Sequence, residues 1–380
     1  MKILQIGYLD PYKNFGGVEA YISNMVSGLH NALGYEVDVL VAGSHSRVVN
    51  SEACRIITLK VPFFNSKFFF LAKYFYARKV KKFLKIRKGE YDVFHFHGDN
   101  GYIGEDFAAK SVLTLHGIAL SKNSIFNRLT SFLPSQIERK NVMNAQIVFS
   151  ISKEAADFFS RFSKKPIQII KQSVDTDFYR PLPVDAKMSL RKELGFSAEA
   201  IIGVIVGTDP VRKGLYTAIK AVEMTGDPRV VLVGIGFPAL TFKASRYNHM
   251  GKVDANTKLR YLQIADFFIF PSIKEGFPIS ILEAASVCLP LIVSKNSGVS
   301  ELEALVPYYY EVDVSQPSEY KSAIEIFIEW FKNNKHTGMI QEQKFLNEYS
   351  ILSMAQIYSR TYKSLKLDFT SQMINEWPDR

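Results

Sequence analysis

Short apolar runs alternate with longer stretches of helical periodicity along the first half of this 380-residue chain. The runs are too short for helices, and such alternation is typical of a parallel β-sheet whose strands are joined by helices. Strands are expected at residues 3–7, 36–42, 55–61, 93–96, 112–115, 147–151 and 167–170. Helices are expected at residues 18–33, 67–88, 126–144 and 153–162.

The second half repeats the pattern and indicates a second sheet, because a chain of this length is long for one core and sufficient for two. Ligands of such sheets bind beyond the carboxyl ends of the strands, so the residues that follow each strand are the functional candidates. Strands are expected at residues 201–206, 230–233, 265–271 and 289–293, and helices at 215–224, 255–264, 318–332 and 354–365.

Two carboxylates stand eight residues apart after the apolar run 265–271. Pro278 is expected to begin a helix, since its fixed φ suits the first turn and its missing N–H is not needed there. Glu275 then lies in the strand-to-helix loop and Glu283 on the second helical turn. The loop amides of Gly276 and Phe277, with the helix N-terminus, offer hydrogen-bond donors to a polar or anionic group.

Gly-Phe-Pro directly after the first glutamate, and Leu-Glu-Ala at the second, resemble the retaining glycosyltransferases of family four. The resemblance implies an α/β chain of GT-B architecture, with two Rossmann-like, doubly wound parallel-sheet domains facing a central cleft. It implies that Glu283 binds the ribose of a nucleotide-sugar and that Glu275 lies beside the transferred sugar. The expected parts are an acceptor-side domain at 1–172, a donor-side domain at 173–352, and a C-terminal helix at 353–380 that crosses back to the first domain.

Arg212 and Lys213 precede the helix expected at 215–224. Two cations at a helix N-terminus oppose the helix dipole, which costs a few tenths of a kcal/mol each unless an anion offsets them. A diphosphate would supply that anion, held by the forked guanidinium of Arg212 and the ammonium of Lys213. Arg-Lys-Gly is also the family's pattern at this position, and a pair of solvated loop charges is the alternative.

The resemblance assigns further roles near the donor. Gly17 belongs to a glycine loop, Asn14 to Glu19, that meets the donor phosphates and the acceptor. His116 lies near the donor sugar, and backbone groups of Lys252 and Val253 meet the nucleobase. The expected catalytic residues are Glu275, His116, Arg212 and Lys213; the expected donor-binding residues are Gly17, Arg212, Lys213, Lys252, Val253, Gly276, Phe277 and Glu283.

His95 and His97 alternate on one expected strand and therefore share a face. A metal pair is conceivable, but no third ligand follows from the spacing. A packed, hydrogen-bonded pair or a general lining of the cleft are the other interpretations. The expected enzyme needs neither a metal nor another cofactor.

The basic excess of the chain lies wholly in its first half: residues 1–180 carry 25 Lys+Arg and 15 Asp+Glu, and residues 181–380 carry 22 of each. Nine of these cations and no acid fall between Lys67 and Lys88, interleaved with aromatic residues. An anionic membrane surface attracts such a segment. A helix with a solvated basic face is the plainer interpretation, and no recognised module favours nucleic acid.

The two cysteines, Cys54 and Cys288, are far apart and favour a reducing compartment. The first residues lack the long apolar core of a signal peptide, and no run approaches the ~20 residues that span a bilayer. The expected location is the cytoplasm, with peripheral binding to the inner face of the membrane.

Together these features predict a retaining, metal-independent glycosyltransferase. It would move a sugar from a nucleotide diphosphate to a glycan or lipid-linked acceptor, such as a precursor of a cell-surface glycan. A nucleotide-sugar epimerase of the same architecture is one alternative, although it would need acid and base carboxylates on the sugar face. A nucleotide-sugar-binding protein that has lost catalysis is another.

Overall fold

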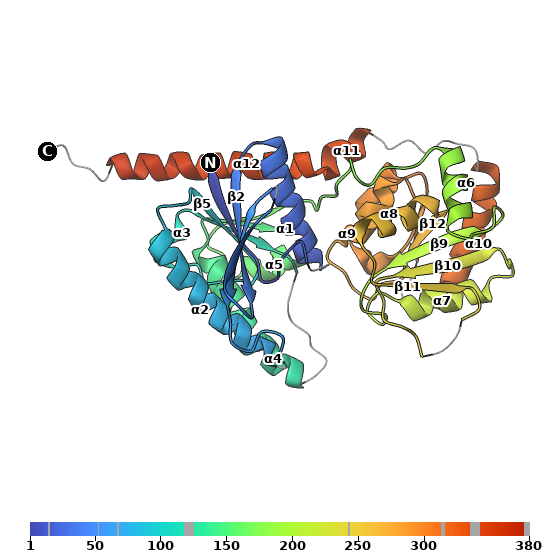
Figure 1. Ribbon diagram of the computed structural model, residues 1–380, viewed down its shortest axis with the longest axis horizontal. Helices are drawn as coiled ribbons and strands as arrows, with labels where there is room; N and C mark the ends of the chain where they lie inside the picture. Colours follow the sequence, from blue (N-terminus) through green and yellow to red (C-terminus); the bar gives the residue numbers. More distant parts are fainter. Residues whose placement is uncertain are drawn as a thin grey trace. The chain divides into compact units, whose positions relative to one another are not determined.

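The computed structural model divides the chain into two compact units, each shown in Figure 1. The N-terminal unit comprises Met1–Ser173 and Ile351–Arg380, and the C-terminal unit comprises Val174–Ser350. The sequence places the boundaries at 172/173 and 352/353, within two residues of these positions. The structure describes residues 1–13, 16–51, 53–66, 68–117, 125–241, 244–312, 316–334 and 343–375, without the side chains of 69, 125–131 and 368–375.

The N-terminal unit contains an eight-stranded sheet in the order β3-β4-β2-β1-β5-β6-β7-β8, parallel except for the antiparallel pair β3–β4. The strand order reverses between β1 and β5. The seven expected strands are present within one or two residues, and only β3 is not predicted, because all four of its residues are exposed. The strands are β1 (Lys2–Ile6), β2 (Glu36–Gly43), β3 (Arg47–Asn50), β4 (Arg55–Lys60), β5 (Val93–His97), β6 (Ser111–Leu115), β7 (Ile147–Ser150) and β8 (Ile167–Ile169).

One expected helix of this unit is divided in the structure. The helix predicted at 18–33 is an α-helix only as far as Ser27, and a π-helical turn, η1 (Gly28–Ala32), follows it. A Cβ atom on Gly28 would lie 2.7 Å from Cγ2 of Ile351, so glycine lets the last helix approach closely. The helices are α1 (Gly17–Ser27), α2 (Phe69–Arg87), α3 (Glu105–Ala108), α4 (Ile125–Asn144), α5 (Lys153–Ser160) and α12 (Ile351–Asn375), the red helix of Figure 1.

The two faces of β5 have different partners. Phe94 and Phe96 belong to an apolar cluster with the buried stripe of α2, which includes Tyr76 and Val80. Because side chains alternate along a strand, the histidines of β5 lie on the opposite face. That face is covered by α1 and α12, whose tyrosines contact the histidine rings.

The C-terminal unit contains a six-stranded, fully parallel sheet in the order β11-β10-β9-β12-β13-β14. This is the doubly wound order of dinucleotide-binding domains, and it reverses between β9 and β12. The strands are β9 (Ile201–Val206), β10 (Val230–Ile235), β11 (Tyr247–Gly251), β12 (Phe267–Phe270), β13 (Leu291–Ser294) and β14 (Tyr309–Val312). The helices are α6 (Val184–Glu193), α7 (Leu215–Met224), α8 (Ala255–Ile264), α9 (Ile279–Ser286), α10 (Pro317–Asn334) and α11 (Gln343–Tyr349), with 3-10 turns η2 (Lys295–Ser297) and η3 (Ser300–Leu305).

A buried ion pair attaches α6, which the sequence does not predict, to the sheet. Asp266, directly before β12, accepts a 2.5 Å bond from the guanidinium of Arg191 on α6 and a 2.9 Å bond from the backbone N–H of Ile202. Both charged side chains are almost fully buried. The carboxylate therefore links a helix to the beginnings of two neighbouring strands.

None of the helices in the described part of the chain is long and apolar enough to cross a bilayer.

Candidate functional site

The reversal point of the C-terminal sheet carries the loop that follows β9. The carboxylate of Asp209 accepts hydrogen bonds from the N–H groups of Val211 (3.1 Å) and Arg212 (3.0 Å), which fixes the loop. Gly214 ends the loop with φ 73°, and a Cβ atom there would lie 1.9 Å from the carbonyl oxygen of Pro271. Glycine is therefore required where this loop meets the one after β12, and the two loops lie together at one edge.

Glu275, in the loop after β12, pairs with both predicted cations. Its Oε1 lies 2.9 Å from Nζ of Lys213 and also accepts a hydrogen bond from the guanidinium of Arg212. Lys213 is largely buried over the ring of Phe270, whereas the side chain of Arg212 is 48% exposed. Burial lowers the pKa of Lys213, and the neighbouring carboxylate acts in the opposite direction. One largely buried cation, one half-exposed cation and a carboxylate thus meet at the reversal point.

The loop between Glu275 and α9 is held against the turn after β13. A Cβ atom on Gly298, whose φ is 69°, would lie 2.5 Å from the carbonyl oxygen of Gly276. The ring of Phe277 is buried and stacks on Tyr349 with 6.0 Å between centroids. Pro278 is the N-cap of α9, so the helix begins one residue later, at Ile279.

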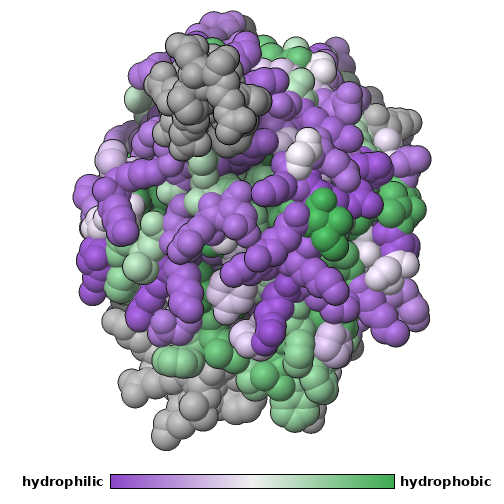
Figure 2. All heavy atoms as spheres, turned by 90° about the vertical axis from the view of Figure 1, so that its left-hand side faces the viewer, coloured by the Kyte–Doolittle hydropathy of each residue, from purple (hydrophilic) through white to green (hydrophobic). Residues whose placement is uncertain are grey.

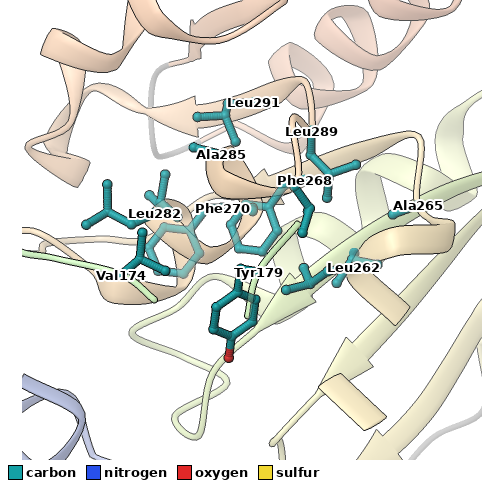
Figure 3. Packing of buried hydrophobic residues seen from close by; sticks show 14 of the residues in the cluster. Val174, Tyr179, Leu262, Ala265, Phe268, Phe270, Leu282, Ala285, Leu289 and Leu291 are labelled. Carbon is teal, nitrogen blue, oxygen red and sulfur yellow. The ribbon is translucent and has the colours of Figure 1, made fainter. Parts of the chain in front are cut away.

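Glu283 lies on the second turn of α9 and is 6% exposed. Its Oε1 accepts hydrogen bonds from the hydroxyl of Tyr179 (2.9 Å) and the ammonium of Lys258 (2.6 Å). In Figure 3 the Tyr179 ring packs within the apolar cluster of this unit and its hydroxyl points away from it. Burial and the nearby carboxylate raise the pKa of Tyr179, which keeps it a neutral donor. Neither partner of Glu283 is predicted from the sequence.

Lys252 and Val253 join the end of β11 to α8. Lys252 is exposed, while Val253 packs against the apolar cluster. Asp254 caps α8 by accepting a 2.8 Å bond from the N–H of Thr257. The packing of Val253 and the helix cap at Asp254 thus fix the backbone of the two residues that are expected to contact the base.

The N-terminal unit holds the other two predicted positions, Gly17 and His116. Gly17 is the first residue of α1 and is exposed, and Asn14 and Phe15 of the same glycine loop lie outside the described residues. His116 follows β6, and its ring meets the ring of Tyr21 edge to face at 4.9 Å. Burial lowers the pKa of His116 to about 3, so the imidazole is neutral.

His95 and His97 form a packed, hydrogen-bonded pair, which confirms one of the sequence interpretations. Their rings stack at 4.6 Å. His97 bonds to Gln5 and His116, and His95 bonds to Tyr362 and to a threonine of β6. Within the described residues, no three His, Cys, Asp or Glu side chains are grouped as a metal site would need.

A second charged cluster, which the sequence does not predict, follows β5. Lys73 of α2 donates 2.6 Å bonds to both carboxylate oxygens of Asp99. Glu138 of α4 is buried beside this pair, with Oε1 close to Gly98. Burial, and then the charge of Asp99, raise the pKa of Glu138 to about 8. Lone lysines and glutamates give no sequence signal, because α2, α4 and β5 assemble this cluster only in the fold.

Comparison with known proteins identifies the class. Residues 15–178 match the model of Glycosyltransferase Family 4 and residues 187–344 match that of Glycosyl transferases group 1. The chain therefore belongs to the glycosyltransferases of family 4, also called group 1, and its fold is of the GT-B class. Sucrose-phosphate synthase from Thermosynechococcus elongatus shares the fold, with a TM-score of 0.76, 18% identity, and 96% of this chain and 98% of that chain covered.

Among curated relatives, TuaC of Bacillus subtilis (strain 168), named as a teichuronic acid biosynthesis glycosyltransferase, is 27% identical over 60% of this chain. An Escherichia coli relative is 27% identical over 56% of this chain, and its name is UDP-Gal:alpha-D-GlcNAc-diphosphoundecaprenol alpha-1,3-galactosyltransferase. The matches span only 59% and 60% of the lengths of these relatives.

Glu138 predicts a specific pH dependence of stability. Because its pKa is raised from 4.5 to about 8 on folding, its stabilising contribution is complete below about pH 4.5 and is lost as the pH rises through about 8. Glu138→Gln cannot ionise, so the melting temperature of the variant relative to wild type should rise between pH 5 and pH 9. Thermal unfolding across that range measures the difference. The exposed Glu105→Gln is the control, and a difference that stays constant with pH would contradict the assignment.

Proposed function

We propose that the protein transfers a sugar from a nucleotide diphosphate sugar to a glycan or lipid-linked acceptor with retention of anomeric configuration. The observation that carries the proposal is the cluster of Arg212, Lys213 and Glu275 at the reversal point of a doubly wound sheet. Such a point is where sheets of this order bind nucleotides. Membership of the glycosyltransferase family supports the reaction class.

The diphosphate would bind to the two cations. Both share a single oxygen of Glu275 in the structure. A diphosphate offers more charge and more acceptors than that carboxylate, and the exposed guanidinium of Arg212 can turn towards it. Lys213, fixed over Phe270, would hold the phosphate that leaves.

The nucleoside would lie towards α9. The hydrogen bonds of Glu283 in the described structure both fall on Oε1, which leaves Oε2 for the ribose hydroxyls. Backbone groups of Lys252 and Val253 would meet the base. Gly17 of the N-terminal unit would allow its helix N-terminus to approach the phosphates.

The chemical step breaks the bond between C1 of the sugar and the phosphate oxygen, while the acceptor oxygen bonds to C1 on the same face. The proton of the acceptor hydroxyl passes to the departing phosphate oxygen. Arg212, Lys213 and the α9 N-terminus would stabilise the charge on the leaving group, which is typically the largest catalytic contribution. Glu275 and the amides of Gly276 and Phe277 would orient the sugar, and we propose that no metal takes part.

Incubation with a panel of nucleotide-sugars, with and without membrane-derived acceptor lipids and with a chelator present, tests this function. Release of free nucleotide diphosphate together with a glycosylated product is expected. An epimerase would return an altered sugar, and a binding protein would show affinity without turnover. Retention would be read from the anomeric configuration of the product.

Substitutions of Lys213, Glu283 and Glu275 should have different effects on nucleotide binding and on turnover. Lys213→Ala should weaken nucleotide diphosphate binding by about 1.5–3 kcal/mol and nearly abolish transfer, because one charge-assisted bond is lost. Glu283→Gln should mainly weaken binding of free nucleotide. Glu275→Gln should spare free nucleotide and lower turnover of the intact donor. Calorimetry and initial rates measure both quantities.

Lys192→Ala, an exposed cation on α6, is the control for these variants. Unchanged nucleotide affinity in Lys213→Ala would refute the phosphate assignment. Equal losses of nucleotide affinity in the two glutamate variants would refute the division of their roles.

We also propose that α2 docks the protein on an anionic membrane. One stripe of α2 faces the core, through Tyr76 and Val80, as the plainer interpretation requires. Three aromatic side chains outside the core are exposed, and the ring of Phe63 contacts those of Phe68 and Phe75. Figure 2 shows the face with α2 and α3, where hydrophilic side chains cover the middle and apolar ones gather at its lower edge. Lys67 of this segment lies outside the described residues.

Basic residues beside exposed aromatics suit an anionic bilayer, which attracts each nearby cation by about 1 kcal/mol while the rings enter the interface. The lipid-linked substrate in the name of the Escherichia coli relative supports the same location for the acceptor. The site of action would then be the cytoplasmic leaflet, and nucleic acid would not be a partner.

Sedimentation with phosphatidylserine vesicles tests this docking. Wild type should bind at low salt and less at high salt, because the attraction is screened. Reversal of four exposed lysines of α2 to glutamate should abolish binding: Lys79, Lys81, Lys82 and Lys85. The same number of reversals on the C-terminal unit should leave binding nearly unchanged: Lys192, Lys220, Lys332 and Lys344. Absence of wild-type binding at low salt, or equal effects of the two sets, would disprove the docking.

A further inference from the structure

The reversal point of the N-terminal sheet carries a polar cluster that the proposed donor site does not use. The strand order reverses between β1 and β5, and sheets of this kind bind ligands at such a point, beyond the carboxyl ends of the strands. Four residues gather there, two after these strands and two from α2 and α4: Tyr8, Asp99, Lys73 and Glu138. They are called the N-terminal edge cluster below.

Contacts among three of these residues fix the cluster. Lys73 donates 2.6 Å bonds to both carboxylate oxygens of Asp99, and its ammonium lies 5.5 Å from the centre of the Tyr8 ring. The side chains of Lys73 and Asp99 are 23% and 12% exposed. The cluster is therefore built from packed side chains, and a ligand can still reach it at the Lys73–Asp99 pair.

Glu138 is the member of the cluster without a hydrogen-bond partner. It lies three residues before Asn141 on α4, so the two side chains share one face of the helix. Asn141 donates to the carbonyl oxygens of Gly98 (3.2 Å) and Gly101 (2.8 Å), which fixes the loop after β5. A Cβ atom on Gly98 would lie 3.4 Å from Oε1 of Glu138, so the carboxyl group is directed at the same loop.

This carboxyl group is buried, since Glu138 is 5% exposed. Within the part of the chain that the structure describes, no hydrogen bond reaches it, and the charged groups that act on it are Asp99 and Lys73. Buried polar groups in proteins are normally hydrogen-bonded. The carboxyl group of Glu138 is therefore available to a ligand.

At neutral pH the N-terminal edge cluster carries no net charge. Burial, and then the charge of Asp99, raise the pKa of Glu138 to about 8, so its carboxyl group is mostly protonated. The same two causes raise the pKa of Tyr8 to about 12, so the phenol is neutral. The charges of Lys73 and Asp99 balance each other. Glu19 of α1, a further titratable group near Lys73, is a carboxyl group as well.

This composition suits hydroxyl groups rather than ions. The neutral groups of Glu138 and Tyr8 can each donate and accept, as the hydroxyls of a sugar ring do. A phosphate would meet one cation that is already paired and a carboxylate that repels it. At the reversal point of the C-terminal sheet the balance is the opposite, because two cations share the carboxylate of Glu275.

We propose that the N-terminal edge cluster binds an uncharged sugar ring of the acceptor, which carries neither a phosphate nor an amine where it meets the cluster. The assignment of this ring to the acceptor rests on the proposed function. The preference for an uncharged sugar is a property of the cluster itself. Lys73 and Asp99 meet the hydroxyl groups at the exposed side, and the carboxyl group of Glu138 meets them from the buried side.

Saturation-transfer NMR on the full chain, without a donor, tests the ligand class. The probes are methyl glycosides of glucose, galactose and mannose, each beside its 6-phosphate and its 2-amino-2-deoxy form. At least one neutral glycoside should bind, and its charged forms should bind about ten-fold more weakly, because the cluster offers them no unpaired opposite charge. A phosphate or amine form that binds as tightly as the neutral glycoside, or no binding of any glycoside, would overturn the proposal.

Variants separate ligand binding from packing. Glu138→Gln keeps a neutral group that donates and accepts, so it should bind the glycoside about as tightly as wild type. Glu138→Leu and Asp99→Ala each remove hydrogen bonds to the ligand and should weaken binding about ten-fold. Glu105→Leu, at an exposed carboxylate of the same unit, is the control.

Thermal unfolding shows which of these variants are folded. If Glu138→Leu does not fold, Asp99→Ala and the selectivity of the wild type decide the result. Glycoside binding that is the same in wild type and in the folded variants would overturn the site.

Kinetics tests the assignment to the acceptor. Glu138→Leu and Asp99→Ala should raise the KM for the acceptor about ten-fold, while the affinity for nucleotide diphosphate and the hydrolysis of the donor by water stay as in wild type. An unchanged acceptor KM in both variants, with glycoside binding as expected, would overturn the acceptor assignment alone. Absence of any transferase activity in wild type would count against the proposed function and leave the glycoside result standing.

Discussion

Parallel strands place their carboxyl ends at the same edge of a sheet, and the candidate residues depend on this constraint. Arg212 and Lys213 follow β9, and Glu275 follows its neighbour β12. His97 ends β5, and His116 follows the neighbouring β6. Residues far apart in the sequence thus meet without any long loop, because each strand delivers one short segment to the edge.

The two units stabilise polar groups at these edges in different ways. In the C-terminal unit, the carboxylates are paired, Glu275 with two cations and Glu283 with the ammonium of Lys258 and the hydroxyl of Tyr179. In the N-terminal unit, burial suppresses charge, so the histidines stay neutral and are satisfied by hydrogen bonds. A buried charge needs a partner of opposite sign, whereas a buried neutral ring needs only a donor and an acceptor.

The sequence predicts elements that carry their own local signal. Apolar runs locate β1, β5, β9 and β12. Pro278 locates the start of α9, which places Glu275 in the loop before the helix and Glu283 on it. Elements that are stabilised by residues far away in the sequence are not predicted from it. The α6 helix, rich in charge, depends on Asp266, and β3 is an exposed edge strand without an apolar pattern. Tyr179 reaches Glu283 across 104 residues, a separation at which no local periodicity gives a signal.

The last helix shows why such distant contacts matter to the whole N-terminal unit. Tyr358 and Tyr362 of α12 supply hydrogen-bond partners to Thr114 and His95, which lie fully buried in a sheet built from the first part of the chain. Without α12 these polar groups would lose their partners, and each unpaired buried group costs about 1–3 kcal/mol. The chain must therefore traverse the entire C-terminal unit before the N-terminal sheet can be completed. Forming these contacts closes sequence separations of 244 and 267 residues, and contacts of such long range slow folding.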